Sequence, residues 1–165
     1  MTKQRHPLLF VVAGGFVAGT FDIVYACAFW ALKASVPPQR ILQSVAAGLL
    51  GKASFEGGGA TVALGLGLHY FIALSMCVVY YLVARHWALL WQRPILMGGL
   101  YGLGLYGVMN YVVIPLSKAS RGSGGTLWVA LSIAVHVALV GIPIALFGAG
   151  SAARRRPARQ PRSKQ

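Results

Sequence analysis

The sequence predicts an all-α membrane protein, a bundle of four transmembrane helices built from two parallel two-span repeats, with a short amphipathic helix on the outer side. Three observations support this class. Of the 165 residues, 57% are hydrophobic and 10% are charged, which is not the composition of a soluble domain. Four apolar runs each reach the roughly 20 residues that cross a hydrocarbon core about 30 Å thick. A motif from the first half of the chain also returns in the second half.

The expected spans occupy most of residues 1–149, and a basic tail follows at 150–165. The four apolar runs lie at 8–32, 60–84, 94–116 and 126–147. Together they leave no room for a soluble domain. Cys27 and Cys77 lie near opposite faces of the membrane in this arrangement, so we expect both to be free thiols.

The first apolar run follows a short basic segment, as it would in a secretory signal peptide. It continues to Leu32, however, and it contains Asp22. A cleaved signal has a shorter and wholly apolar central region, so we expect an uncleaved span.

Small residues four positions apart let a neighbouring helix approach closely, and two spans carry such a spacing. The glycines expected to pack helices are Gly15 and Gly19 in the first span and Gly98 and Gly102 in the third. Pro115 and Pro143 fall near the expected ends of the third and fourth spans, where a kink costs little and marks no site.

Residues 37–50 are too polar for a span, yet their apolar positions recur at helical spacing. The apolar positions are Ile41, Leu42, Val45, Leu49 and Leu50, and the polar ones are Arg40, Gln43 and Ser44. Pro37 and Pro38 suit the start of a helix, and Gly51 suits its end. We predict an amphipathic helix in the outer interface or across the mouth of the bundle. The alternative is a solvated linker.

The repeat is readable in two places. Lys52-Ala53-Ser54 corresponds to Lys118-Ala119-Ser120, and His69 to His136; Gly14-x4-Gly19-x2-Asp22 corresponds to Gly102-x4-Gly107-x2-Asn110. Glycine matches arise easily by chance in this composition, so the Lys-Ala-Ser triplets and the histidines carry most of the argument. Repeats in parallel orientation predict a pseudo-two-fold axis along the membrane normal.

Basic residues set the expected orientation. With the N-terminus in the cytoplasm, the cytoplasmic segments hold about twice as many lysines and arginines as the outer loops. The tail contributes Arg154, Arg155, Arg156 and Arg159, which we expect to attract anionic lipid head groups. Nothing aromatic or structured accompanies these charges, so nucleic-acid binding is not expected. We predict a bacterial inner-membrane protein with both termini cytoplasmic.

The sequence carries no catalytic motif, and its only acidic residues are Asp22 and Glu56. We therefore predict no enzymatic activity and no cofactor. The remaining candidates form an intramembrane polar cluster of Asp22, His69, Asn110 and His136. At about 1.5 Å per residue, Asp22 and both histidines reach a common depth near 15 Å, and Asn110 lies about one turn shallower.

An aspartate at mid-membrane costs at least about 2.5 to 3.5 kcal/mol, so it should face the bundle interior and have a partner. We expect His69, which belongs to the same repeat. The cluster then admits a proton or ion path, or a hydrogen bond that only joins helices. Two histidines at one depth also admit a bis-His haem or a metal ion, although a duplication alone explains the matched depth.

Three functions remain open. The first is a membrane protein with a polar cavity for a proton or small solute. The second is a structural or accessory subunit, either as a homo-oligomer or beside a larger membrane partner. The third is a redox protein that uses His69 and His136. The substrate, any metal and the oligomeric state cannot be read from the residues.

The segments 36–44 and 48–51, the glycine-rich loop, His69 and 109–116 resemble an uncharacterised group of small bacterial inner-membrane proteins, the YagU-like proteins. The likeness covers nearly all of residues 8–147. It implies four spans and an inner-membrane location, and it implies no activity and no functional residue.

Overall fold

The computed structural model describes residues 7–120 and 124–153, and within these ranges it contains helices and no strands. Four of its helical segments are long and apolar enough to cross a membrane: Leu8–Ala34, Gly58–Ala84, Pro94–Leu116 and Gly125–Ser151. The predicted all-helical class with four spans is confirmed.

The elements follow one another in a simple order. They are α1 (Pro7–Ala34), α2 (Pro38–Leu50), the 3-10 helix η1 (Gly51–Phe55), α3 (Gly58–Ala84), α4 (Ala88–Gln92), α5 (Pro94–Val108), the π-helix η2 (Met109–Val113), α6 (Ile114–Leu116), α7 (Gly125–Val135), the π-helix η3 (His136–Gly141) and α8 (Ile142–Ala153). The third span is thus α5, η2 and α6, and the fourth is α7, η3 and α8.

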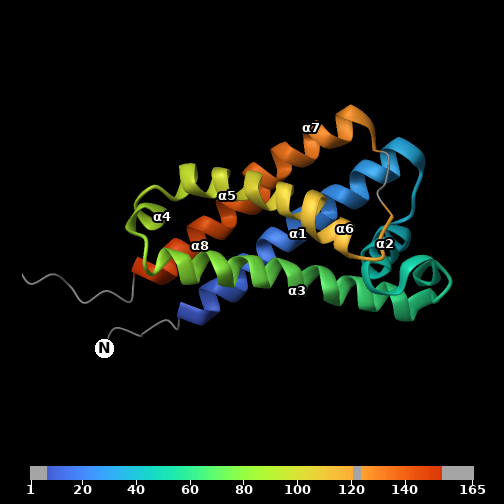
Figure 1. Ribbon diagram of the computed structural model, residues 1–165, viewed down its shortest axis with the longest axis horizontal. Helices are drawn as coiled ribbons and strands as arrows, with labels where there is room; N and C mark the ends of the chain where they lie inside the picture. Colours follow the sequence, from blue (N-terminus) through green and yellow to red (C-terminus); the bar gives the residue numbers. More distant parts are fainter. Residues whose placement is uncertain (1–6, 121–123, 154–165) are drawn as a thin grey trace, which may run out of the picture.

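The bundle has two different ends (Figure 1). The start of α1, the short α4 and the end of α8 lie together at what we call the α4 end. The helix α2, η1 and the start of α7 lie at the opposite end, which we call the α2 end. Both described termini of the chain therefore lie on one side of the bundle.

The half of the bundle toward the α4 end is tightly packed. Helix α8 lies against α1, α3 and α5, and the residues at this contact include Val11, Cys77, Tyr80 and Ile144, each at most 2% exposed. The spans α3 and α5 meet through tyrosines. The Tyr101 hydroxyl donates to the carbonyl of Met76 at 2.8 Å, and the rings of Tyr80 and Tyr101 meet edge to face with centroids 5.0 Å apart.

Glycines lie where helices cross most closely. A Cβ on Gly102 would lie 2.0 Å from the carbonyl oxygen of His136, and one on Gly98 would lie 2.8 Å from that of Gly141. A Cβ on Gly15 would lie 2.9 Å from the Cα of Leu74, and one on Gly19 would lie 3.0 Å from the Cβ of Ala73. A side chain at Gly102, Gly98 or Gly15 would force the helices apart, and one at Gly19 would require its neighbour to shift slightly.

Two spans contain π-helical turns, and each turn precedes a proline. Proline lacks an N–H, and its ring collides with the carbonyl four residues earlier, which is Tyr111 for Pro115 and Leu139 for Pro143. Both of these residues lie inside the wider π-helical turns. Contrary to expectation, Pro143 does not mark the end of the fourth span, because α8 continues to Ala153.

Helix α2 packs against α3 on an unexpected face. Gln43, which we expected on the polar face, is 6% exposed. Its Nε2 donates to Thr61 Oγ1 at 3.3 Å and to the carbonyl of Gly58 at 3.4 Å. Leu49 and Leu50 are exposed instead. The amide thus buries its polar atoms by joining two helices, and the simple division into an apolar and a polar face was wrong at this residue.

The two Lys-Ala-Ser triplets come together at the α2 end. The backbone N–H of Lys118 donates to the carbonyl of Gly48 at 2.9 Å. Lys52, Lys118 and Ser120 line a small pocket of about 60 Å³ between the two segments. The internal repeat itself stays a prediction.

Candidate functional site

A cavity of about 770 Å³ lies in the half of the bundle toward the α2 end. All four spans contribute to its wall, and α2 lines it through Ile41, Ser44 and Val45. Asp22, His69, Asn110 and His136 all line it. Its volume falls within the roughly 300 to 1,000 Å³ of typical small-molecule sites.

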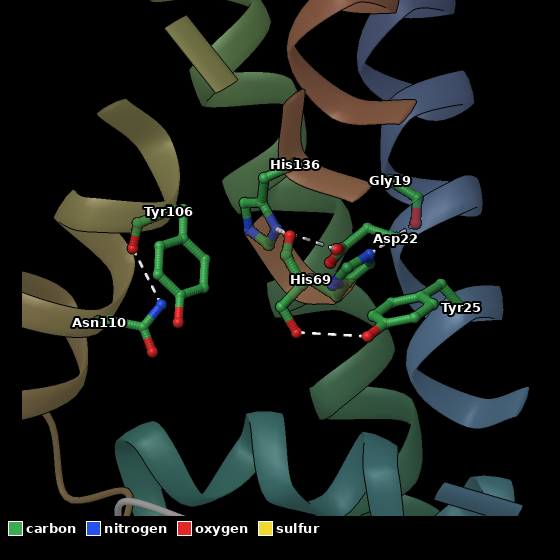
Figure 2. A network of polar contacts seen from close by, with 8 residues as sticks. Gly19, Asp22, Tyr25, His69, Tyr106, Asn110 and His136 are labelled. Carbon is green, nitrogen blue, oxygen red and sulfur yellow. Dashed lines mark hydrogen bonds and ion pairs between the residues drawn. The ribbon is translucent and has the colours of Figure 1, made fainter. Parts of the chain in front are cut away.

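The structure pairs Asp22 with His136 and not with His69 (Figure 2). Oδ1 of Asp22 lies 4.0 Å from Nδ1 of His136, and the two side chains are 29% and 17% exposed. The expectation that His69 is the partner was wrong, because α1 packs against η3 as well as α3 at this level. The 4.0 Å separation exceeds the range of a hydrogen bond, and within residues 7–120 and 124–153 no hydrogen bond reaches the carboxylate.

Each histidine is held by a backbone carbonyl. His69 Nε2 lies 2.8 Å from the carbonyl oxygen of Gly19, and His136 Nδ1 lies 2.9 Å from that of Ser132. A carbonyl oxygen only accepts, so each of these ring nitrogens carries the hydrogen. In the neutral imidazoles, Nδ1 of His69 and Nε2 of His136 therefore retain a lone pair that can take a proton.

Asn110 lies across the cavity from this pair (Figure 2). Its Nδ2 donates to the carbonyl of Tyr106 within the same helix, at 2.9 Å. The Tyr106 ring meets the ring of His136 edge to face, with centroids 5.5 Å apart. Among the described residues, Asn110 therefore makes no direct hydrogen bond to Asp22 or His136.

Aromatic residues of α1 and α7 form a wall that sequence reasoning missed. The rings of Tyr25 and Trp128 stack 5.5 Å apart, and the Tyr25 hydroxyl lies 3.4 Å from Ser132 Oγ. Trp30 lies beside Trp128 at 5.3 Å. A signal for this wall existed, since Tyr25 and Trp30 lie three and eight residues after Asp22, on the same helical face.

Arg40 was also missed as a cavity residue, because we placed it on a solvated face. It lines the cavity from α2. Its guanidinium lies 4.6 Å from the centroid of the Phe55 ring, and Nη1 donates to the Phe55 carbonyl at 3.2 Å. Among the lining residues, Asp22 and Arg40 are the aspartate and the arginine, and neither a glutamate nor a lysine joins them.

Three other expectations from the sequence concern a metal ion, the two cysteines and the arginines of the tail. Within the described part of the chain, no group of three or more His, Cys, Asp or Glu side chains could hold a metal ion. Cys27 and Cys77 are free thiols. Arg154, Arg155, Arg156 and Arg159 of the tail lie outside the described residues.

Comparison with known protein families, curated proteins and solved structures gives no match for this chain. The resemblance to YagU-like proteins therefore stays a prediction, and the function has to be argued from the cavity itself.

Proposed function

We propose that the protein is a non-enzymatic, multi-pass membrane protein that binds a small polar solute and a proton in the cavity at the α2 end. The observation that carries this proposal is the position of the Asp22 carboxylate. It lies within a membrane span, lines the cavity of about 770 Å³, and has two oriented imidazoles beside it. An ionisable residue within a membrane span is costly, and such residues usually mark substrate, ion or proton paths.

The chemistry available at this site is proton exchange. The carboxylate can accept a proton, and each imidazole retains one nitrogen that can do the same. Because backbone carbonyls fix the rings, the accepting nitrogens keep their places when Asp22 changes its charge. Among the described lining residues, no hydroxyl or thiol group hydrogen-bonds to a histidine or to Asp22, so none is activated as a nucleophile.

The geometry favours a carrier over an open pore. The packed residues Cys77, Tyr80 and Ile144 separate the cavity from the α4 end. A solute or proton can therefore cross only if the packed half rearranges. The π-helical turns η2 and η3, which contain Asn110 and His136, interrupt the regular α-helical hydrogen bonding of their spans.

We further propose a bacterial inner-membrane location, with the α4 end and both termini in the cytoplasm. The count of basic residues in the full sequence supports this orientation. The cavity then faces outward, and the tail arginines contact anionic lipids.

Proton flux in liposomes tests the proposal. Purified protein reconstituted with a pH-sensitive dye inside should dissipate an imposed pH gradient faster than protein-free liposomes do. Asp22→Asn, which keeps the shape and removes the carboxylate, should reduce the flux to the protein-free level. Glu56→Gln is the matched control, since Glu56 is exposed and lines neither pocket. Wild-type flux in Asp22→Asn, or no flux above background in the wild type, would contradict the proposal.

A further inference from the structure

The cavity carries opposite charges toward its two ends. Asp22 lies at mid-span on α1, and Arg40 lies on α2 at the end of the bundle. The wall between them runs along α1 from Asp22 to Trp30, which is about 12 Å along the helix axis at 1.5 Å per residue. This stretch carries no further full charge. The site is therefore polarised along its length.

Both charged groups have unused binding capacity. Within the described residues the Asp22 carboxylate accepts no hydrogen bond, and the imidazole beside it donates to Ser132. The Arg40 guanidinium uses one of its five N–H donors on the Phe55 carbonyl. A partner of opposite charge could bind at either end without displacing an existing hydrogen bond.

The surface between the two charges is apolar and aromatic. Tyr25, Trp30 and Trp128 form one side, and Ile41, Ile72 and Val113 contribute elsewhere. Such a wall fits a hydrocarbon chain. The rings of Tyr25 and Tyr106, near the acid, also suit an ammonium group, because aromatic faces attract cations.

We infer that the cavity binds a zwitterionic solute, with its ammonium group at Asp22, its carboxylate at Arg40 and a short apolar chain between them. This inference rests on the proposed function of the cavity and names the class of solute. A simple anion would make no contact with Asp22, and a simple cation would make none with Arg40. A carboxylate can also bind a guanidinium through two parallel hydrogen bonds.

Calorimetric titration of the full-length protein in detergent tests the inference with four probes. ε-Aminohexanoate carries both charges on a flexible chain, hexylamine and hexanoate each carry one, and glycine carries both too close together to reach the two ends. We expect ε-aminohexanoate to bind, and each of the other three to bind at least about tenfold more weakly, because none of them can contact both charges at once.

Two variants test which charged residue of the cavity binds which group of the solute. In Asp22→Asn, ε-aminohexanoate should bind no better than hexanoate, and in Arg40→Gln it should bind no better than hexylamine. Because Arg40 also bonds the Phe55 carbonyl, Arg40→Lys keeps the charge as a check on local structure and should retain the preference for the zwitterion. Lys52→Gln removes a charge at the same end of the bundle but outside the main cavity, and should change nothing.

Equal binding of hexylamine, hexanoate and ε-aminohexanoate would overturn the inference and leave the proposed function standing. Binding of none of the four would also overturn it, and the proposed function would then depend on proton flux alone. Retention of the zwitterion preference in both Asp22→Asn and Arg40→Gln would show that the two charges do not recognise the solute.

Discussion

Asp22 has no hydrogen-bond donor in the described part of the protein, and neither imidazole depends on it. His69 is oriented by the carbonyl of Gly19 and His136 by that of Ser132. Both imidazoles therefore keep their carbonyl partners when Asp22 is replaced. We therefore expect the carboxylate to lower the stability of the bundle, a cost that a role in binding explains.

Asp22→Leu should accordingly stabilise the bundle. An aspartate at the centre of a span costs at least about 2.5 to 3.5 kcal/mol, but Asp22 is partly exposed to the cavity, so its replacement should raise the free energy of unfolding by a part of that amount. Thermal unfolding in detergent, followed by circular dichroism, measures the change. Asp22→Asn serves as the isosteric control and should have a smaller effect. A lower melting temperature in Asp22→Leu would show that the acid holds His136 in place.

Sequence reasoning identified the residues of this polar cluster but not their pairing. The depth of Asp22, His69 and His136 follows from counting residues along spans, which needs only the helical rise. Pairing depends on which helices are neighbours and on how each is rotated about its axis. Glycine contacts set this arrangement, as when Gly102 brings α5 against the carbonyl of His136. Such contacts depend on all four spans together and cannot be read from one of them.

At the scale of elements, α2 packs along α3, and their contact includes one very close backbone approach and one bridging side chain. A Cβ at Gly65 would lie 1.9 Å from the carbonyl oxygen of Leu42, and Gln43 bonds both Thr61 and Gly58. The backbone of α2 at Leu42 thus lies directly against Gly65 of α3. Since α2 lines the cavity, this contact also positions Arg40.

Gly65→Ala should separate α2 from α3. A methyl group at this position must push a backbone carbonyl aside, and overpacking of this kind costs about 1 to 3 kcal/mol. Gly67→Ala is the matched control two residues later in the same helix. Its Cβ would meet nothing within 4 Å, so it should be neutral or stabilising by up to about 1 kcal/mol through helix propensity. Melting temperatures of both variants test this, and equal values would contradict the close contact.

The π-helical turns show why sequence patterns misplaced the end of the fourth span. Gly148-Ala149-Gly150 has the composition of a helix stop, which puts Pro143 near an end. In the structure Gly148 is buried, and a Cβ there would lie 2.9 Å from the Tyr80 ring. Gly148 allows close packing against Tyr80 and does not end the helix. The helix therefore continues, and Pro143 is accommodated inside it by the wider turn η3.

At the scale of the whole molecule, the two halves of the bundle differ in packing. The half toward the α4 end is closed by Tyr80, Ile144 and their neighbours, and the half toward the α2 end encloses the cavity. Composition and span length were sufficient for the four-span class. They could not indicate a cavity, because a cavity is space left between helices whose apolar faces look alike in sequence. The direction in which the cavity faces depends on topology.

Neutralising the tail should disturb that topology without weakening the bundle. In the full sequence, with the α4 end cytoplasmic, ten lysines and arginines lie on the cytoplasmic side and five outside. Replacing Arg154, Arg155, Arg156 and Arg159 with glutamine leaves six against five, so the orienting bias nearly vanishes. We expect a mixed population of orientations, measured with C-terminal reporters that are active on only one side of the membrane.

The matched control replaces the same four arginines with lysine, which keeps the charge and should keep a single orientation. The glutamine variant should melt at nearly the wild-type temperature in detergent. The positive-inside bias acts during membrane insertion, and a detergent micelle has neither a membrane potential nor two different leaflets. A single cytoplasmic orientation in the glutamine variant would contradict the role of the tail in topology. A large fall in its melting temperature would show instead that these arginines stabilise the bundle, and the outward direction of the cavity would then need other support.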